Sequence, residues 1–297
     1  MRRLEPCLFA DGFTFLESPK WYNGQLWVSD VFDNKVYALS SKGQPVTIID
    51  VPNRPGGLGF LSGGSLIIAS ARDSRLLLYD GGQLSEYADL SNYTTGWLND
   101  FAVDGHDRIY TGNFGYDFVA GDALKATCLH RVDPDRTVTT VAKDVEFPNG
   151  SVVIDDGRTL VVAETWAARL TAFDVSEHGE LSNRRIFADL VDRQPDGICA
   201  DAEGGIWAGI YNTGEFLRLL DGGRITHRIQ FEGSGISCTL GGPEDRTLFM
   251  TAFVGTEEEL ALGKRNSAVY TADVDVPAPA HRGGEGCPPS AAYKTML

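Results

Sequence analysis

The chain has 297 residues, with 26 Lys and Arg against 41 Asp and Glu, which gives a net charge of −15. Hydrophobic residues make up 42% and charged residues 23%, so the composition is that of a soluble globular protein and excludes a disordered chain. The excess of acidic residues argues against nucleic acid or an anionic membrane as partner. No run of 18 apolar residues that could span a bilayer is present, and the segment after Arg2 and Arg3 lacks the apolar stretch of a signal peptide.

One pattern recurs six times along the chain. Each copy has a turn, a short apolar strand, small residues and then a second strand. The anchoring pairs are Leu26-Trp27, Leu66-Ile67, Ile109-Tyr110, Leu160-Val161, Ile206-Trp207 and Leu248-Phe249, and successive pairs are separated by 40, 43, 51, 46 and 42 residues. This is the spacing of β-propeller blades, whereas a β-sandwich or barrel lacks a repeat of this length. The sequence predicts an all-β, six-bladed β-propeller that forms a single domain over residues 1–297.

Further strands follow each anchor in chain order. The next strand is predicted at 34–40, 74–80, 126–133, 168–175, 214–221 and 267–274, and edge strands at 44–50, 83–89 and 137–143. The longest interval contains residues 115–126, where we predict an inserted loop over one face. Residues 276–297 are rich in Pro, Gly and Ala, and we predict a tail that lies on the surface or is partly disordered.

The segment before each anchor is predicted to be the innermost strand of its blade, along the central axis. These segments are 16–21, 55–60, 98–104, 148–155, 195–201 and 236–242. They place Glu17, Asn99, Asn149 and Asp196 at the head of the inner strand in four blades. Two carboxylates and two amide oxygens would make an oxygen-only site, which suits Ca²⁺, Mg²⁺ or Mn²⁺, and Zn²⁺ can also be held by carboxylates. The alternative is that Asn149-Gly150 and Asp196-Gly197 are simply turn dipeptides.

Other catalytic patterns are missing from the sequence. There is no GxSxG nucleophile motif, and no Cys has an obvious partner His. The five cysteines are odd in number, scattered and free of CxxC, which is typical of reduced thiols that serve in packing. We therefore expect a cytoplasmic protein.

Several short motifs, in the right order from about residue 9 to about 275, resemble the senescence marker protein / gluconolactonase / luciferin-regenerating enzyme family. They are Glu17-Ser18-Pro19 with Trp21, Asn99-Asp100, Phe147-Pro148-Asn149-Gly150 with 156–160, Pro195-Asp196-Gly197 with 201–204, and Cys238 with 241–243 and 247–248. The resemblance implies a six-bladed propeller with one divalent cation near its axis. Among the candidate cations we favour Ca²⁺. It implies Glu17, Asn149 and Asp196 as ligands and Asn99 beside the metal, as ligand or substrate contact. Members of the family hydrolyse lactones, and related propellers hydrolyse organophosphorus esters.

The sequence departs from the sugar-acid lactonases at two positions. Those enzymes carry an Arg where this chain has Trp97, and a Glu near the position of Tyr116, although Asp117 is adjacent. Together with Phe114, Phe118 and Trp166, these residues would make the mouth of the channel aromatic. Apolar pockets with few polar anchors select apolar or aromatic ligands.

We therefore expect a divalent-metal-dependent hydrolase of a lactone or related ester, with a small, apolar or aromatic substrate. Asp196 is the expected general base or water-orienting group, with Asp100 and Glu164 as reserves. For Glu164 we favour the alternative of a solvated carboxylate without a catalytic role. The alternatives are organophosphate hydrolysis or a non-hydrolytic reaction of secondary metabolism at the same site, or a ligand-binding propeller without activity. The sequence makes no prediction of the oligomeric state.

Overall fold

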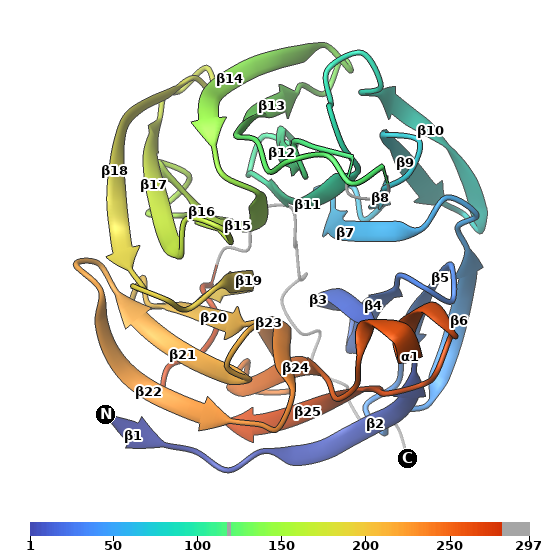
Figure 1. The fold of residues 1–297 in the computed structure, drawn as a ribbon, viewed down its shortest axis with the longest axis vertical. Coiled ribbons are helices and arrows are strands. Elements are labelled where there is room, and N and C mark those ends of the chain that lie inside the picture. The colour runs from blue at the N-terminus through green and yellow to red at the C-terminus, as the bar shows by residue number, and fades with distance from the viewer. Residues whose placement is uncertain (118–119, 281–297) are drawn as a thin grey trace, which may run out of the picture.

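The computed structural model describes residues 1–117 and 120–280. In this part of the chain, six sheets are arranged around a central axis (Figure 1), each with four antiparallel strands and one with a short fifth strand at its edge, which confirms the predicted six-bladed propeller. Each sheet runs from an inner strand at the axis to an outer strand at the rim. The blades follow one another in chain order.

The strand bounds match the predicted repeat closely. Blade one has β3 (Leu16–Tyr22), β4 (Gln25–Asp30), β5 (Lys35–Leu39) and β6 (Pro45–Asp50), and blade two has β7 (Pro55–Phe60), β8 (Leu66–Ser70), β9 (Arg75–Asp80) and β10 (Gln83–Asp89). Blade three has β11 (Leu98–Val103), β12 (Ile109–Asn113), β13 (Thr127–Val132) and β14 (Val138–Val145), and blade four has β15 (Pro148–Ile154), β16 (Thr159–Glu164), β17 (Arg169–Val175) and β18 (Leu181–Asp189). Blade five has β19 (Pro195–Ala200), β20 (Ile206–Ile210), β21 (Glu215–Leu220) and β22 (Arg224–Gln230).

Blade six is completed by the start of the chain. It contains β23 (Ser234–Gly241), β24 (Thr247–Phe253) and β25 (Ser267–Asp273), and its outer strand is β2 (Cys7–Phe13), which pairs antiparallel with β25. The short β1 (Arg2–Arg3) pairs parallel with β22 of blade five. The N-terminal segment therefore joins the last two blades on the outside of the ring (Figure 1).

The hydrophobic core lies between neighbouring blades. One cluster, for example, joins Val161 and Leu170 of blade four to Ile198, Ile206 and Leu217 of blade five, and all five side chains are buried. Apolar side chains on both faces of each sheet are thereby removed from water, which is the main stabilising contribution in such a fold.

Two glycines beside predicted site residues allow the inner strands to approach closely. A Cβ on Gly150 would lie 2.4 Å from the amide nitrogen of Ile198, and a Cβ on Gly197 would lie 1.9 Å from Oγ of Ser237. Neither glycine has a positive φ, and both lie inside strands, β15 and β19. The turn-dipeptide alternative for Asn149-Gly150 and Asp196-Gly197 is therefore wrong, because these glycines serve blade packing rather than a left-handed backbone.

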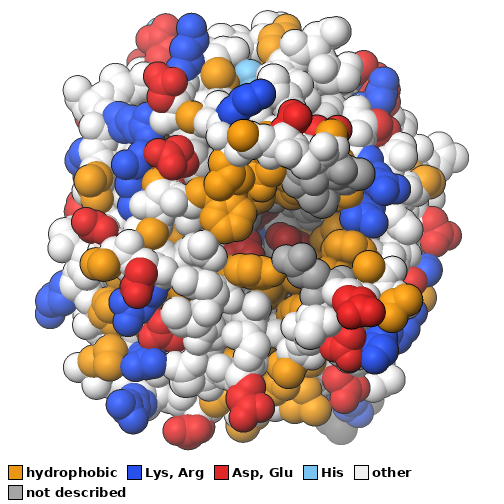
Figure 2. Space-filling view, in the orientation of Figure 1, with side chains coloured by type: hydrophobic (Ala, Val, Ile, Leu, Met, Phe, Trp, Pro, Cys, Tyr) orange, Lys and Arg blue, Asp and Glu red, His pale blue; other side chains and the backbone are white. Residues whose placement is uncertain are grey.

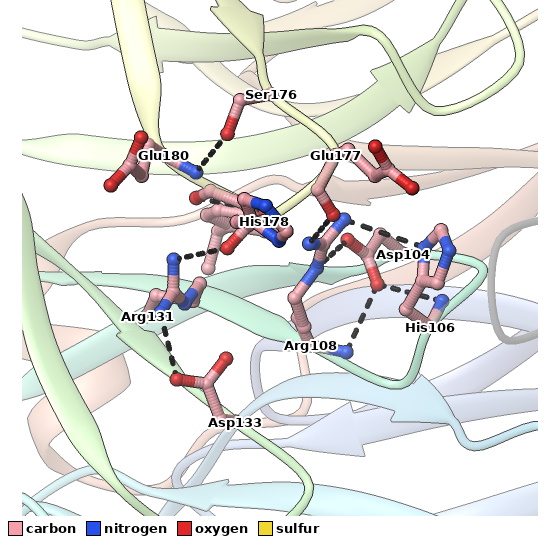
Figure 3. Close-up of polar contacts among 11 residues, drawn as sticks. Asp104, His106, Arg108, Arg131, Asp133, Ser176, Glu177, His178 and Glu180 are labelled. Carbon is pink, nitrogen blue, oxygen red and sulfur yellow. Dashed lines mark hydrogen bonds and ion pairs between the residues drawn. The ribbon is translucent and has the colours of Figure 1, made fainter.

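Arginines join blades three and four at the face opposite the inner-strand heads (Figure 3). Arg108 donates from Nε to Asp104 Oδ2 at 2.6 Å and from a terminal nitrogen to the carbonyl oxygen of Glu177 at 2.8 Å. Arg131 likewise donates to the carbonyl oxygen of His178 and to Asp133, each at 2.8 Å. These contacts hold the 176–180 turn of blade four against blade three.

The connections outside the repeat differ in form. The predicted insertion lies between β12 and β13, and its described residues form neither helix nor strand. The β24–β25 connection contains a short helix, α1 (Glu257–Ala261), which the sequence did not predict and whose N-terminus has a capping box of Thr256 and Glu259.

The first residues of the predicted tail pack against the propeller. Ala278 is buried and donates its N–H to the carbonyl oxygen of Asp245, and the carbonyl oxygen of Pro277 accepts from the N–H of Ala202. Ala278 and Pro279 also line a cavity of about 100 Å³ in the axial channel, below the heads of the inner strands. The rest of the predicted tail lies outside the described residues. No helix in the described part of the chain has the length and apolar character needed to span a bilayer.

Candidate active site at the head of the inner strands

A local irregularity sets the first residues of each inner strand apart from its sheet. In β15, Pro148 pairs with Glu164 and the next paired residue is Ser151, so Asn149 and Gly150 are skipped in the register. The same irregularity leaves Asn99 and Asp100 of β11, and Asp196 and Gly197 of β19, out of the regular strand pairing. Bulges of this kind re-aim side chains away from the regular ladder. They explain how Asn99, Asn149 and Asp196 face the axis from three different blades.

Glu17, Asp100 and Asp196 converge on the axis. They come from β3, β11 and β19, which are not neighbouring strands, yet their charges act on one another. Burial, followed by the charges of Asp196 and Asp100, raises the pKa of Glu17 well above its ordinary value. Burial and the charge of Asp100 raise the pKa of Asp196 to about 8, against the lowering effect of the Asn149 side chain. The charges of three carboxylates thus act on one another at the axis, and no Lys, Arg or His of the described residues forms an ion pair with them.

Two oxygen atoms at this point have no hydrogen-bond partner among the residues that the structure describes. Asn149 donates from Nδ2 to Oγ1 of Thr165 at 3.3 Å, which fixes the amide, yet its Oδ1 is buried and unpaired. Oδ1 of Asp196 is also buried and unpaired. Buried polar atoms in native proteins nearly always have a partner, so a pair of unpaired acceptors fits the ligands of a cation.

The other polar residues at the axis are oriented by hydrogen bonds. Asn99 donates from Nδ2 to the carbonyl oxygen of Pro148 at 3.0 Å. Asp100 accepts from Oγ of Ser18 and from the N–H of Phe101, both at 2.9 Å. Both bonds use Oδ1 and hold the Asp100 carboxylate in place, and its role as a reserve base stays a prediction.

The donor set fits a hard divalent cation. Carboxylate and amide oxygens converge, and two of them lack any other partner. No three His, Cys, Asp or Glu side chains within residues 1–117 and 120–280 come close enough to hold a metal by themselves. A cation held by Glu17, Asn149 and Asp196 would therefore depend on the amide oxygen of Asn149, and this ligand set stays a prediction.

An aromatic row lines one side of the mouth. The ring centroids of Trp97 and Phe114 are 6.0 Å apart, those of Phe114 and Phe147 4.6 Å, and those of Phe147 and Trp166 5.1 Å. The ring of Tyr116 is tilted against that of Phe147, with their centroids 6.1 Å apart. Four of the five predicted aromatic residues are thus brought together, while Phe118 lies outside the described residues.

Phe147 is the residue that joins the row, and the sequence reasoning did not select it. It directly precedes β15, within the Phe147-Pro148-Asn149-Gly150 motif, and that position was the available signal. Figure 2 shows the result from outside: a hollow at the centre of this face, with acidic side chains at its base and hydrophobic side chains around it.

The comparisons with known proteins agree with this fold. The family model for the SMP-30/gluconolactonase/LRE-like region matches residues 15–254. The chain belongs to this family. It is 27% identical to regucalcin from Danio rerio over 273 residues, which are 89% of this chain and 92% of that protein. In fold it resembles a calcium-binding regucalcin from Agrobacterium tumefaciens, with a TM-score of 0.81, 19% identity and coverage of 97% and 100% of the two chains. It also resembles a gluconolactonase from Xanthomonas campestris, with a TM-score of 0.73, 24% identity and coverage of 91% and 89%.

Glu164 has a different role in this family member from the one expected. Its side chain is fully buried, and it pairs with Arg169 at 3.0 Å and Arg184 at 2.9 Å. It also accepts from the N–H of Glu146 at 2.8 Å, in the loop that leads into β15. The expectation of a solvated carboxylate is wrong, because these partners enclose it. Glu164 fixes the approach to Asn149 and is not a reserve base.

The substitution of Trp97 for the Arg of sugar-acid lactonases does not remove positive charge from the mouth. The guanidinium carbon of Arg54 lies 4.9 Å from the centre of the Trp97 ring, and that of Arg72 lies 5.2 Å from it. The sequence reasoning missed both, since they lie on loops outside the repeat. The mouth is therefore aromatic and locally cationic.

Proposed function

We propose that the protein is a divalent-metal-dependent hydrolase of a lactone or related ester, with an aryl or alkyl group on the substrate. The observation that carries the proposal is the pair of unpaired acceptor oxygens, on Asn149 and Asp196, among converging carboxylates below an aromatic mouth. The gluconolactonase among the relatives in fold supports the reaction type, and the calcium-binding regucalcin supports Ca²⁺. Mg²⁺, Mn²⁺ and Zn²⁺ are the other candidates.

Glu17, Asn149 and Asp196 would hold the cation. When bound, it would polarise the substrate carbonyl and lower the pKa of an attacking water. Asp196 takes the proton of that water as general base. The water oxygen adds to the carbonyl carbon, the ring C–O bond breaks, and the proton from Asp196 passes to the departing alcohol oxygen. Asn99, oriented by Pro148, contacts the substrate, and the aromatic row holds its apolar part away from water.

A panel of aryl, alkyl and sugar-acid lactones tests this function. Protein stripped with chelator is assayed alone and with Ca²⁺, Mg²⁺, Mn²⁺ or Zn²⁺ restored. We expect turnover only with a cation, fastest for an aryl or alkyl lactone. Asp196→Asn should abolish it, whereas Glu244→Gln, which changes an exposed carboxylate in the β23–β24 turn, should not. Cation binding without turnover of any lactone or organophosphate would favour a ligand-binding propeller instead.

We also propose that the protein acts in the cytoplasm. The four cysteines in the described part of the chain, Cys7, Cys128, Cys199 and Cys238, form no disulfide. This supports a reducing environment.

A further inference from the structure

Two arginines converge on one indole ring at the mouth. Arg54 lies between β6 and β7, and its guanidinium carbon is 4.2 Å from the ring centre of Phe32 and 4.9 Å from that of Trp97. Arg72 lies between β8 and β9, 5.2 Å from the Trp97 ring centre. Trp97 is two residues before Asn99, so both cations sit beside the entrance to the axial site.

Neither guanidinium has a carboxylate partner in the part of the chain that the structure describes. The acidic neighbour in sequence, Asp73, is instead bound by Arg75, Ser70 and Asn53. Burial and the charge of Arg72 lower the pKa of Arg54, so the two cations repel one another. Two like charges held together, one half-buried on Arg54 and one exposed on Arg72, are stabilised when an anion joins them.

We propose that Arg54 and Arg72 form a subsite for a carboxylate on the substrate, which makes the substrate a carboxylate-bearing aryl or alkyl lactone or ester. The proposal rests on the proposed function for the identity of the reacting group. Guanidinium groups bind carboxylates through paired N–H donors, and stacking on Phe32 and Trp97 holds the Arg54 plane in one orientation.

The charge distribution gives the subsite a role in orienting the substrate. The chain has a net charge of −15, and Arg54 and Arg72 place two like cations beside the entrance, so a carboxylate is attracted to that one side of the mouth. A substrate with a carboxylate at one end and a neutral ester at the other is therefore bound in one direction. The carboxylate lies at the arginines, and the ester points to the axis.

Calorimetry with an unreactive pair of ligands tests the subsite. The probes are 3-phenylpropanoate and its neutral amide, 3-phenylpropanamide, each titrated with and without Ca²⁺. We expect the wild-type protein to bind the carboxylate at least about tenfold more tightly than the amide, as for hydrogen bonds to charged groups. The double variant Arg54→Ala, Arg72→Ala should bind both equally, and Arg54→Lys should keep part of the preference.

The control removes one positive charge far from the mouth. Arg224→Ala, at the exposed start of β22, should leave the tenfold preference intact. Arg72 is exposed, so Arg72→Ala alone serves if the double variant does not fold, and it should reduce the preference severalfold. Equal binding of the two probes by the wild-type protein, or an unchanged preference in the arginine variants, would overturn the proposal. Because the probes are not hydrolysed, this result is independent of whether any lactone is turned over.

Discussion

Trp97 connects the two halves of the mouth at the scale of single residues. Its ring packs beside Phe114 and also lies against the guanidinium groups of Arg54 and Arg72. It can therefore act on apolar substrates by contact and on charged ones by holding the arginines in place. The two effects are separable by the charge of the substrate.

For a neutral aryl lactone, Trp97→Ala should raise KM more than it lowers kcat. An aryl ring that buries roughly 100 Å² gains about 2.5 kcal/mol, so losing this contact should cost more than tenfold in KM. Steady-state kinetics of the variant beside Trp97→Phe measures this. If KM is unchanged, or gluconolactone is the best substrate of the panel, the aromatic pocket has been misread.

Glu164→Gln should destabilise the protein at neutral pH by about 2 kcal/mol, because two arginines lose their buried partner. Burial alone would raise the pKa of Glu164, but Arg169, the N–H of Glu146, Thr171 and Arg184 hold it below its ordinary value of 4.5. A carboxyl whose pKa is lowered by folding stabilises the folded state at pH values above its pKa in the unfolded state. This stabilisation is lost as the pH falls through its pKa in the folded state. Denaturation at pH 7 and below pH 4 should therefore show a difference that shrinks in acid. A constant difference would mean that charge is not the cause.

At the scale of elements, the inner strands position the site and pack the blades with the same residues. Asp196 and Gly197 are consecutive, and the glycine lets β19 approach Ser237 of β23. A substitution at the glycine alters neither the charge nor the ligands of the site, but it should still disturb the site through the packing of the strands.

Gly197→Ala should lower stability by about 1–3 kcal/mol and weaken cation binding, because the new Cβ would meet Oγ of Ser237 at 1.9 Å. Adding Ser237→Gly should recover part of both losses. Gly63→Ala is the matched control, since a Cβ there meets nothing within 4 Å. Chemical denaturation and calorimetry follow the two effects, and an unperturbed single variant would argue against the observed packing of β19 on β23.

The elements also show where sequence reasoning succeeds and where it stops. The inner strands and their polar heads follow from a repeat, so Glu17, Asn99, Asn149 and Asp196 could be aligned before any coordinates were known. The loops at the mouth have no such period. For this reason Phe147, Arg54 and α1 were not predicted. Glu164 was predicted to be solvated because its arginine partners come from other strands, and the position of Glu164 in the sequence does not reveal them.

At the scale of the whole molecule, the ring is closed by pairing of β2 with β25. Phe9 packs edge-on against Phe249 at 5.3 Å, and Phe13 against Tyr37 of blade one at 5.4 Å. The closing strand therefore joins blade six to blade one through side chains as well as through the backbone.

Removing residues 1–13 should lower Tm sharply and promote association, since β25 would become an exposed edge. Removing residues 1–3 takes away only β1 and should have a small effect. Thermal unfolding with light scattering compares the two truncations. Equal Tm values would show that strand closure contributes little to stability.

The central claim is that a divalent cation binds at the axis through Glu17, Asn149 and Asp196. The most direct measurement is calorimetric titration of Ca²⁺ into chelator-stripped protein, with Asp196→Asn and the control Glu244→Gln. We expect one site per chain in the wild-type protein and in the control, and its loss in Asp196→Asn, since that change removes a ligand charge. Undiminished Ca²⁺ binding by Asp196→Asn, or no binding by the wild-type protein to any of the four cations, would contradict it.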